Sequence, residues 1–300
     1  MNIDTMRIFC DVVLHQSFSR GALVNDVSQS AATQSIHRLE RHLGVQLVDR
    51  SRRPFILTPE GRICYNGFRN ILESYDTVIA MVQTLNDKER GNIRIGATCS
   101  VGLYDMGQVM RYFIKSCPKA RVNLELMHSD RIYKSILASD IDFGVVSFPI
   151  SGLEITIVPL GVEKMVYVCN PDHALAKQKS ISLEQLHGSD LIAFERDQMV
   201  RKEIDRHLRQ RLISVNIVAE YENIETIKQA VEVGLGGAIL PVNSVRAEAK
   251  LGTLVSIPVS SPEIVQPLAI VHKQGKVFTP AMTEFISHLT ECPWDGIDET

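Results

Sequence analysis

The chain has 300 residues, of which 22% are charged and 45% hydrophobic, and its formal net charge at pH 7 is −3. These values are typical of a globular protein with two or three domains, and they exclude a disordered chain and a wholly basic nucleic-acid coat protein. The sequence has no apolar run as long as a membrane span, no signal-peptide pattern and no CxxC pair among its six cysteines, so we expect a cytoplasmic protein with reduced thiols and no membrane partner.

Two short helices are predicted at the start of the chain. Residues 5–15 have the spacing of an amphipathic helix of about three turns. Ser17 or Ser19 can cap a second helix, and Asn25-Asp26 makes the turn that ends it. The apolar faces of the two helices consist of Met6, Phe9, Val12 and Val13 in the first and of Ala22 and Leu23 in the second.

The stretch 26–50 predicts the second helix of a helix-turn-helix. Ser28 is its expected N-cap, and Gly44 ends it as a left-handed residue. The apolar stripe consists of Ala31, Ile36, Leu39 and Leu43, and the opposite face carries Gln29, Ser30, Thr33, Gln34, His37, Arg38 and Arg41. Amides and hydroxyls can read base edges in a major groove, while cations hold phosphates. The alternative is the solvated face of an ordinary surface helix.

An arginine-rich hairpin follows this helix. Residues 38–62 hold six arginines against three acidic residues, whereas the chain after residue 90 holds 21 Lys+Arg and 25 Asp+Glu. Short apolar runs at 45–48 and 55–57 predict the two strands of a wing. Its arginines, which can lie along phosphates or enter a narrow minor groove, are Arg50, Arg52 and Arg53. The alternative is a basic surface loop.

A long helix is predicted from Pro59 to about Lys88. Thr58 is its N-cap, with proline and glutamate in the first turn. Its apolar residues alternate at spacings of three and four, which indicates a heptad seam: Phe68, Ile71, Leu72, Tyr75, Val78, Ile79, Val82 and Leu85. We expect dimerisation through Phe68, Leu72, Tyr75, Ile79 and Val82; packing on the chain's own C-terminal part is the alternative. The charged stretch 88–92 is the predicted hinge.

Strands and helices alternate from residue 92 onward, which is typical of α/β layers with mainly parallel sheets. The predicted strands are 92–97, 122–126, 143–147, 155–160, 165–169, 191–194, 217–221, 238–240 and 267–272. The predicted helices are 106–113, 132–137, 200–212, 224–233, 243–249 and 279–289.

Motifs for catalysis and metal binding are missing from the sequence. The glycines at 234–237 lack a following GK[ST] and fit the end of a helix before a buried strand better than a phosphate loop. The sequence has no GxSxG motif around Ser100 and no HExxH spacing. Cys99 lies before a helix that could stabilise a thiolate, although a small packed residue is the favoured interpretation. We therefore predict no enzyme, no catalytic or metal site and no cofactor.

The first ninety residues closely resemble the LysR-type transcriptional regulators. The residues that carry the resemblance are Phe9, Ser17-Phe18-Ser19, Ala22, Ser28-Gln29-Ser30-Ala31, Ile36, Leu39-Glu40, Leu43-Gly44, Leu47, Arg50, Leu57-Thr58 and Gly61. Three positions depart mildly: Gly21 replaces an alanine, Ser30 a proline and Val48 a phenylalanine. The resemblance continues more weakly through residues 91–96, 142–144 and 233–241, and so covers nearly the whole chain.

This resemblance implies a winged helix-turn-helix DNA-binding domain at 1–58, a linker and dimerisation helix at 59–90 and an effector-binding domain at 91–295. The last would have two α/β lobes, as in periplasmic binding proteins: lobe I at about 91–161 and 267–295, and lobe II at about 162–266. The chain would cross between the lobes near Gly161-Val162 and Ile264–Pro267. The implied partners are double-stranded DNA with an interrupted palindrome, a small-molecule effector and further copies of the chain in a homodimer or homotetramer. RNA polymerase is a candidate partner.

We expect a small anionic effector between the lobes. The strand 92–97 ends at Thr98, Cys99 and Ser100, where a helix N-terminus and two hydroxyls can donate hydrogen bonds. The resemblance adds the opposite wall, which is formed by Ser147, Phe148, Phe194, Asn223 and Ile224. The alternative is that the hydroxyls only cap the helix. Two other functions are alternatives: a ligand-binding module acting through protein contacts, which the arginine wing disfavours, and a two-lobed α/β enzyme, for which the sequence lacks a catalytic set.

Overall fold

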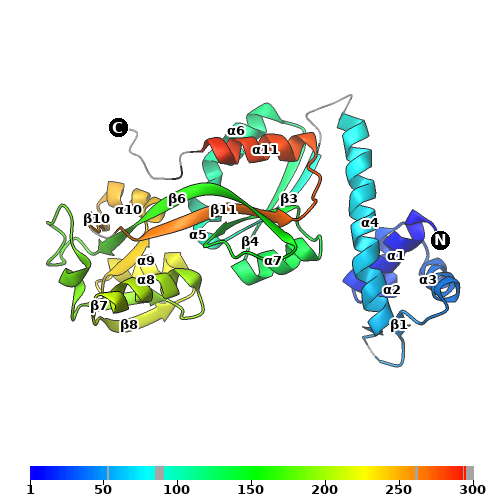
Figure 1. The fold of residues 1–300 in the computed structure, drawn as a ribbon, viewed down its shortest axis with the longest axis horizontal. Coiled ribbons are helices and arrows are strands. Elements are labelled where there is room, and N and C mark those ends of the chain that lie inside the picture. Colours follow the sequence, from blue (N-terminus) through cyan, green and yellow to red (C-terminus); the bar gives the residue numbers. More distant parts are fainter. Residues whose placement is uncertain (53, 85–90, 261–262, 293, 295–300) are drawn as a thin grey trace. The chain divides into compact units, whose positions relative to one another are not determined.

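The computed structural model of the chain describes residues 1–52, 54–84, 91–260, 263–292 and 294. They fall into two compact units, Met1–Asp87 with Val277–Thr279 and Lys88–Lys276 with Pro280–Thr300, here called the N-terminal and C-terminal units (Figure 1). The long helix is grouped with the N-terminal unit, and the predicted domain boundary at 58/59 stays a prediction. Among the described residues, no helix has both the length and the hydrophobicity of a membrane span.

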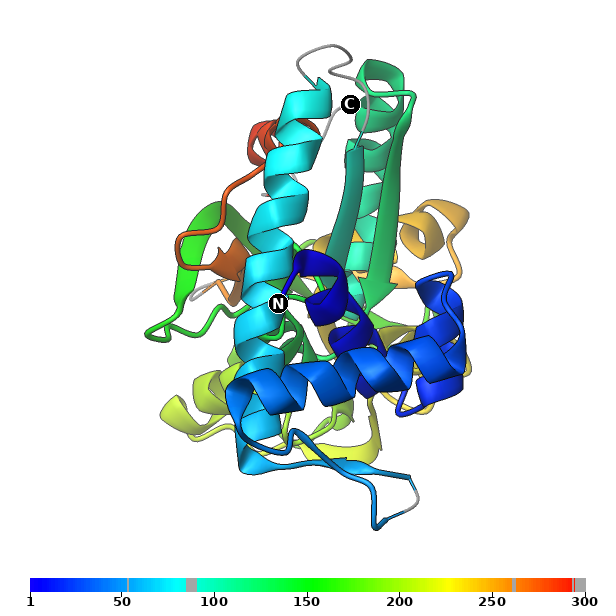
Figure 2. The same cartoon turned by 90° about the vertical axis from the view of Figure 1, so that its right-hand side faces the viewer.

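The N-terminal unit is a small helical domain with a wing. Its elements are α1 (Ile3–Leu14), α2 (Phe18–Val24), α3 (Gln29–Leu43), β1 (Val48–Asp49), β2 (Ile56–Leu57) and α4 (Pro59–Thr84). The predicted caps are confirmed, since the Ser17 hydroxyl accepts from the Arg20 N–H at 3.3 Å and the Ser28 hydroxyl accepts from the Ala31 N–H at 3.2 Å. Gly44 ends α3 with φ of 72°. Figure 2 shows α3 across this unit with the wing hairpin beside it.

The buried face of α3 differs from the predicted stripe. Its core positions are Ala32, Ile36, Leu39 and Glu40, at the i, i+4, i+7, i+8 spacing of a core-facing helix. Ala31 is only partly buried and Leu43 is exposed, as is Leu23 of α2. The stripe is rotated by about one residue because the carboxylate of Glu40 has partners inside the unit, which a count of apolar residues does not reveal.

The start of α4 packs directly against the wing. The Thr58 hydroxyl accepts from the Gly61 N–H at 2.9 Å, which confirms the predicted cap. A Cβ added to Gly61 would lie 1.9 Å from the carbonyl oxygen of Leu47, so a side chain at this position would force helix and wing apart.

Further along α4, the residues of the predicted heptad seam fall into a buried group and an exposed group. Phe68 and Leu72 are buried in the core of their own unit, so their assignment to a dimer interface is wrong. The exposed apolar residues of the seam are Ile71, Tyr75, Val78, Ile79 and Val82. Leu85 and residues 88–90 of the predicted hinge lie outside the described residues.

The C-terminal unit is built on a seven-stranded mixed sheet in the order β10-β6-β11-β5-β3-β4, with β9 also on β6, and on a parallel pair β7-β8. The strands are β3 (Gly91–Ala97), β4 (Ala120–Leu126), β5 (Phe143–Ser147), β6 (Ile155–Cys169), β7 (Asp190–Phe194), β8 (Asn216–Tyr221), β9 (Ala238–Pro241), β10 (Val255–Pro258) and β11 (Val265–Lys273). The helices are α5 (Cys99–Tyr104), α6 (Met106–Ser116), α7 (Ser129–Leu137), η1 (Leu183–Leu186), α8 (Met199–Gln210), α9 (Ile224–Glu232), η2 (Val242–Val245), α10 (Arg246–Leu251) and α11 (Pro280–Glu291).

The expectation of mainly parallel sheets is wrong. Strand β3 pairs in parallel with β4 and β5, and β7 pairs in parallel with β8. The other ladders of this unit are antiparallel in the described residues: β11 with β5 and β6, and β6 with β9 and β10. The two strands predicted at 155–160 and 165–169 are the single long strand β6. Leu268 pairs with Gly161 and Ala269 with Pro159, so Leu160 is an extra residue in the register and the strand runs through this irregularity without a break.

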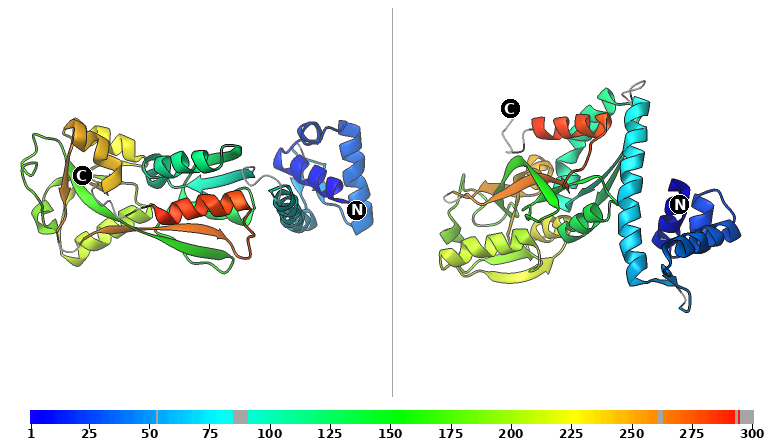
Figure 3. Two further views of the ribbon diagram at one scale, coloured as in Figure 1. Left: turned by 90° about the horizontal axis from the view of Figure 1, so that it is seen from above. Right: turned by 45° about the vertical axis from the view of Figure 1, so that its right-hand side comes forward.

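Strands β6 and β11 connect two lobes. The first half of β6 and the end of β11 join the β5-β3-β4 sheet, while the second half of β6 carries β9 and β10 (Figure 3). At the transition Val162 pairs with Pro267, so the two segments predicted to cross between lobes lie side by side. A cluster of buried residues formed largely by β6, β7, α8, α9 and β9 is the core of the second lobe.

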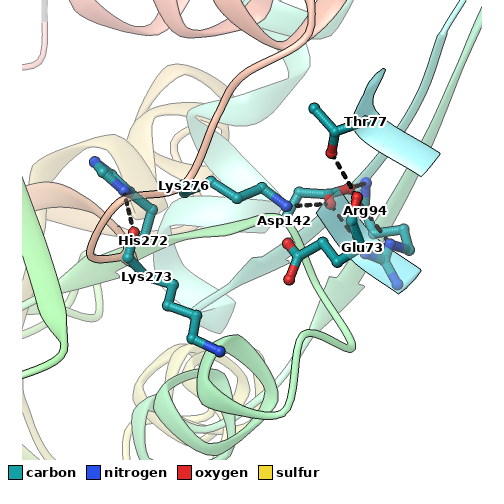
Figure 4. A network of polar contacts seen from close by, with 7 residues as sticks. All are labelled: Glu73, Thr77, Arg94, Asp142, His272, Lys273 and Lys276. Atoms are coloured by element: carbon teal, nitrogen blue, oxygen red, sulfur yellow. Dashed lines mark hydrogen bonds and ion pairs between the residues drawn. The ribbon is translucent and has the colours of Figure 1, made fainter. Parts of the chain in front are cut away.

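Asp142 links neighbouring segments of the first lobe through hydrogen bonds and ion pairs (Figure 4). Its Oδ2 accepts from the Arg94 N–H at 2.8 Å, and its Oδ1 lies 3.0 Å from Arg94 Nη2 and 2.9 Å from Lys276 Nζ. Burial raises the pKa of Asp142, but the hydrogen bonds of Arg94 and the charge of Lys276 outweigh it, so the pKa lies below its ordinary value. The carboxylate therefore holds three segments of the sheet together.

Candidate functional site

The exposed face of α3 gathers the predicted base-reading residues. Gln29, Ser30, Gln34, His37 and Arg38 are exposed and Thr33 is partly buried. Their neighbours hold several of them in place. The Ser19 hydroxyl donates to Gln29 Oε1 at 3.1 Å, and the Thr33 hydroxyl donates to the Gln29 carbonyl at 2.9 Å. The hydroxyls of Ser28 and Ser30 are 2.9 Å apart. The helix start thus presents a pre-positioned row of amides and hydroxyls.

The wing is tied to α3 by Glu40, a residue that sequence reasoning did not single out as a site. Glu40 is 7% exposed, and its Oε1 accepts from the Leu47 N–H at 3.0 Å and the Val48 N–H at 3.3 Å. Its Oε2 lies 3.0 Å from Arg50 Nη2 and 3.4 Å from His37 Nδ1. The available signal was that Glu40 falls on the same helical face as the buried Ile36.

Arg50 and Arg52 differ in their surroundings. The Arg50 guanidinium, paired with Glu40, also lies 5.7 Å from the ring centre of Phe18, so it is part of the scaffold of the wing. Arg52 is exposed at the tip of the hairpin. Arg53, the third predicted wing arginine, lies outside the described residues.

A cavity of about 550 Å³ opens in the C-terminal unit where strands of both lobes end. Six of the eight predicted effector residues line it: Thr98, Cys99, Ser100, Ser147, Phe194 and Ile224. Phe148 and Asn223 do not. The Phe148 ring packs against the core of lobe II and its N–H donates to the Pro267 carbonyl at 2.8 Å, whereas Asn223 Oδ1 accepts from the Glu225 N–H at 2.9 Å as the cap of α9.

Sequence reasoning missed most of the charged and polar lining of this cavity. The missed residues include His128, Asp130, Asp197, Gln198, Lys202, Glu222 and Gln266. Most of them follow directly on the ends of β4, β7 and β8. The signal that could have found them is the rule that ligands bind at the carboxyl ends of parallel strands, which holds for these strands as well as for the one that ends before Thr98.

Thr98 carries a buried hydroxyl that is aimed at no partner in the protein. The residue is 8% exposed, and its Oγ1 makes no hydrogen bond within the described part of the chain. Both backbone polar groups of Thr98 form hydrogen bonds: its N–H donates to the Val145 carbonyl, and its carbonyl accepts from the Gly102 N–H. The side chain does not cap α5, contrary to the simpler alternative. A buried hydroxyl without a partner is costly, so this position favours a ligand that bonds to it.

The electrostatics of the cavity are mixed. Helices α7, α8 and α9 begin at its wall and direct their free N–H groups and positive dipole ends toward it. Lys202 adds a cation, whereas Asp130 and Asp197 add anions. His128 Nε2 lies 2.5 Å from Glu222 Oε1 and so joins the two lobes across the cavity.

Cys99 is not activated in this setting. Burial raises the pKa of its thiol, and the nearby charge of Glu222 raises it further. A backbone hydrogen bond at Cys99 lowers the pKa of the thiol, but burial and Glu222 outweigh it, so the thiol is protonated at neutral pH. In the stretches of chain that the structure describes, no group of three or more His, Cys, Asp and Glu side chains is arranged to hold a metal ion.

Two family models match the chain. Residues 86–292 match the LysR substrate binding domain, and residues 3–62 match the bacterial regulatory helix-turn-helix protein of the lysR family. A probable RuBisCO transcriptional regulator of Thalassiosira pseudonana is 28% identical and covers 96% of each chain. The uncharacterised HTH-type transcriptional regulator YbhD of Escherichia coli (strain K12) is 25% identical and covers 99% of this chain and 93% of its own.

Solved structures share the fold. Full-length OxyR from Pseudomonas aeruginosa superposes with a TM-score of 0.81 at 20% identity and covers 98% of this chain and 96% of its own. Full-length CbnR complexed with its target DNA gives a TM-score of 0.61 at 21% identity and covers 96% and 98%.

Proposed function

Because this chain belongs to the LysR family of DNA-binding transcriptional regulators, we propose that a small molecule in the interlobe cavity controls how it binds an interrupted palindrome in double-stranded DNA. The assembly proposed is a homodimer or homotetramer, with RNA polymerase as a further partner. One observation carries the proposal: a single chain joins the exposed row of Gln29, Ser30 and Gln34 to a cavity of about 550 Å³ that contains the unpaired Thr98 hydroxyl.

We propose that the start of α3 reads bases and that the cations hold the backbone. The first residues of a recognition helix contact base edges, and Gln29 and Gln34 carry amides that suit adenine. Thr33 lies between them, and His37 follows on the same face. Arg38 and Arg52 are exposed cations suited to phosphates. Arg50 can contribute to phosphate binding while Glu40 holds it, since its side chain remains 31% exposed.

We predict that Gln34→Ala relaxes sequence preference at one or two base pairs, with a loss of about 1–3 kcal/mol of discrimination, because a bidentate amide–adenine contact disappears. Arg52→Ala, the comparison variant, should weaken binding to all sequences alike and reduce the salt slope by about one. Sites selected from a random double-stranded library, followed by anisotropy titrations at several salt concentrations, measure both effects. Unchanged preference in Gln34→Ala would remove that residue from base reading.

We propose an effector with one anionic group and several hydrogen-bond donors. The anion is favoured beside the free N–H groups at the start of α8, beside Lys202 and beside the hydroxyls of Thr98 and Ser100. Asp130 and Asp197 would repel a second anionic group and accept hydrogen bonds from donors instead. A thermal-shift screen of small metabolites is the direct route to the effector, since a ligand that binds only the folded state stabilises it.

Thr98→Ala combined with Ser100→Ala should lower effector affinity at least tenfold and leave DNA binding without effector unchanged. The two hydroxyls each contribute about 1 kcal/mol or more when they bond to a charged ligand. Calorimetry with a compound from the screen measures the affinity, and Ser151→Ala, an exposed serine outside the cavity, is the matched control. Equal affinity in the double variant would locate the site elsewhere, and lost DNA binding would reveal a folding defect.

A further inference from the structure

A buried polar cluster joins the two lobes where the long strands cross. Glu163 of β6 is 1% exposed, and its Oε1 accepts from the Asn243 N–H at 3.0 Å. Its Oε2 accepts from Gln266 Nε2 of β11 at 3.2 Å. Asn243 of η2 in turn donates through Nδ2 to Asp105 Oδ1 at 2.8 Å. One chain of hydrogen bonds therefore runs from the α5–α6 junction in lobe I to η2 in lobe II, and on to both crossing strands.

This cluster contains two carboxyl groups, of which Glu163 is almost fully buried and Asp105 is partly buried. Burial raises the pKa of Glu163 to about 8, and the charge of Asp105 contributes to the rise. Burial also raises the pKa of Asp105 to about 6, although Asn243 and Arg246 act in the opposite direction. The two groups titrate as a pair, and the pair holds one proton more readily than two isolated carboxylates would.

The groups around the two carboxyl groups are compatible with a bound proton. Asn243 Oδ1 is buried and has no hydrogen-bond partner among the described residues, so it can accept from a protonated carboxyl group. Arg246 of α10 is the nearby cation, but it is exposed and its field is screened by water. Burial raises the pKa of the Cys292 thiol, and the charge of Asp105 raises it further.

The ion pairs on the other side of η2 are already satisfied. Lys228 of α9 is buried and lies 2.6 Å from Glu248 Oε1 and 2.9 Å from Glu225 Oε1. Its Nζ also donates to the Ser244 carbonyl at 3.0 Å. The cation that acts on Glu163 and Asp105 is instead the exposed Arg246, so a proton can supply the counter-charge inside the cluster.

The same cluster reaches the effector cavity by two routes. Gln266, which donates to Glu163, also lines the cavity. Helix α5 begins at the cavity with Cys99 and ends at Tyr104, next to Asp105. The Tyr104 hydroxyl donates to Glu225 of lobe II, and Lys228 Nζ lies 4.8 Å from the centre of its ring. A change in the angle between the lobes must therefore alter the distances within this cluster.

We propose that Glu163, Asp105 and Asn243 form a proton-operated latch between the lobes. With one proton bound from solvent, a single negative charge remains and the lobes stay joined. When the proton returns to solvent, the carboxylates of Glu163 and Asp105 repel each other and loosen the junction. Proton and effector then act on the same pair of lobes. The regulatory role of the latch therefore rests on the proposed function. The latch itself is tested without effector or DNA.

The protein contains its own reporter for this test. Trp294, the single tryptophan of the chain, is 3% exposed and donates from Nε1 to the Leu289 carbonyl at 2.8 Å. A Cβ added to Gly161 would lie 3.3 Å from Trp294 Cβ, so the indole lies against the crossing two residues from Glu163. Tryptophan emission of the full-length protein between pH 5 and pH 9 should show a transition with a midpoint near pH 8, where the pair releases its last proton.

Glu163→Gln should abolish this transition. The glutamine keeps an oxygen for the Asn243 N–H, and the amide of Gln266 can turn to present its own oxygen, so the variant resembles the protonated state. Glu263→Gln is the matched control, because Glu263 is exposed and pairs with Lys164 at 3.1 Å near the same crossing. Its emission curve should match that of the unchanged protein.

Urea unfolding at each pH supplies the second measurement. Both folded-state pKa values lie above those of an unfolded chain, so the stability that these groups contribute is complete below about pH 4. That stability is lost as the pH rises through about 6 and about 8, and Glu163→Gln should remove most of this loss.

A transition that persists in Glu163→Gln would overturn the proposal, because another group would then be titrating. A flat emission curve with a stability loss that the variant removes would also overturn it, since the proton would bind without moving the lobes. Flat curves in both measurements would show that no proton is taken up. None of these outcomes depends on DNA or effector binding, so failure of the latch and failure of the proposed function are distinguishable.

Discussion

Val78→Asp and Ile79→Asp should each convert the protein into a monomer at concentrations where the unchanged protein is a dimer. The apolar residues Ile71, Tyr75, Val78, Ile79 and Val82 are exposed along α4 at heptad spacing, and such a row needs a partner. A carboxylate buried there without a partner costs about 3 kcal/mol, which weakens association about 100-fold. Sedimentation of the full-length variants measures the effect.

Loss of the dimer should also reduce DNA binding, because a two-fold assembly places one α3 on each half-site. Asn66→Asp is the control for the new charge, since Asn66 is exposed on the same helix away from the apolar row. If both seam variants sedimented as intact dimers, α4 would not be the dimerisation element. Phe68 and Leu72 do not serve this test, because changing them would destabilise their own unit.

Glu40→Ala should lower the free energy of unfolding of the N-terminal unit by about 2–3 kcal/mol, because it leaves buried hydrogen-bond donors without an acceptor. The N–H groups of Leu47 and Val48 would lose the carboxylate, and Arg50 would lose its ion pair. The contribution of Arg50 is the smaller one, since its side chain is partly exposed and screened by solvent. The wing should detach from α3, and DNA affinity should fall with it.

Hydrogen exchange of the full-length protein locates this effect. The amides of Leu47 and Val48 should exchange faster in Glu40→Ala, while amides of the C-terminal unit keep their rates. Glu40→Gln separates the two contributions, because its amide oxygen can still accept from the backbone but does not hold the charge of Arg50. Arg41→Ala, an exposed neighbour on α3, is the control. Unchanged exchange at residues 47 and 48 would contradict the anchoring role.

Local chemistry could be predicted from the sequence because its causes lie within a few residues. The caps at Ser17, Ser28 and Thr58 and the left-handed Gly44 were all expected, and each hydrogen bond or dihedral involves neighbours in the chain. The polar face of α3 and the order of strands and helices follow from periodicity in the same way. Resemblance to the LysR family added the two lobes, which periodicity alone does not reveal.

Only the tertiary structure decided which faces are buried and which strands pair. The rotation of α3 depends on the partners of Glu40 seven to ten residues away, and the burial of Phe68 depends on contact with the core formed by α1. A short apolar run marks β11 as a strand, but its antiparallel pairing with β6 joins residues about a hundred positions apart.

In the effector cavity and at the lobe junction, too, the sequence predicts some residues and only the tertiary structure reveals the others. Thr98 and Ser100 were predicted from one strand end, while His128, Glu222 and Gln266 come from other segments that only folding brings to the cavity. Glu163 and Asp105 do not stand out in the sequence, and they are linked through Asn243 because β6, η2 and the end of α5 meet at the crossing. Long-range packing sets solvation, and solvation sets the charge state of these groups.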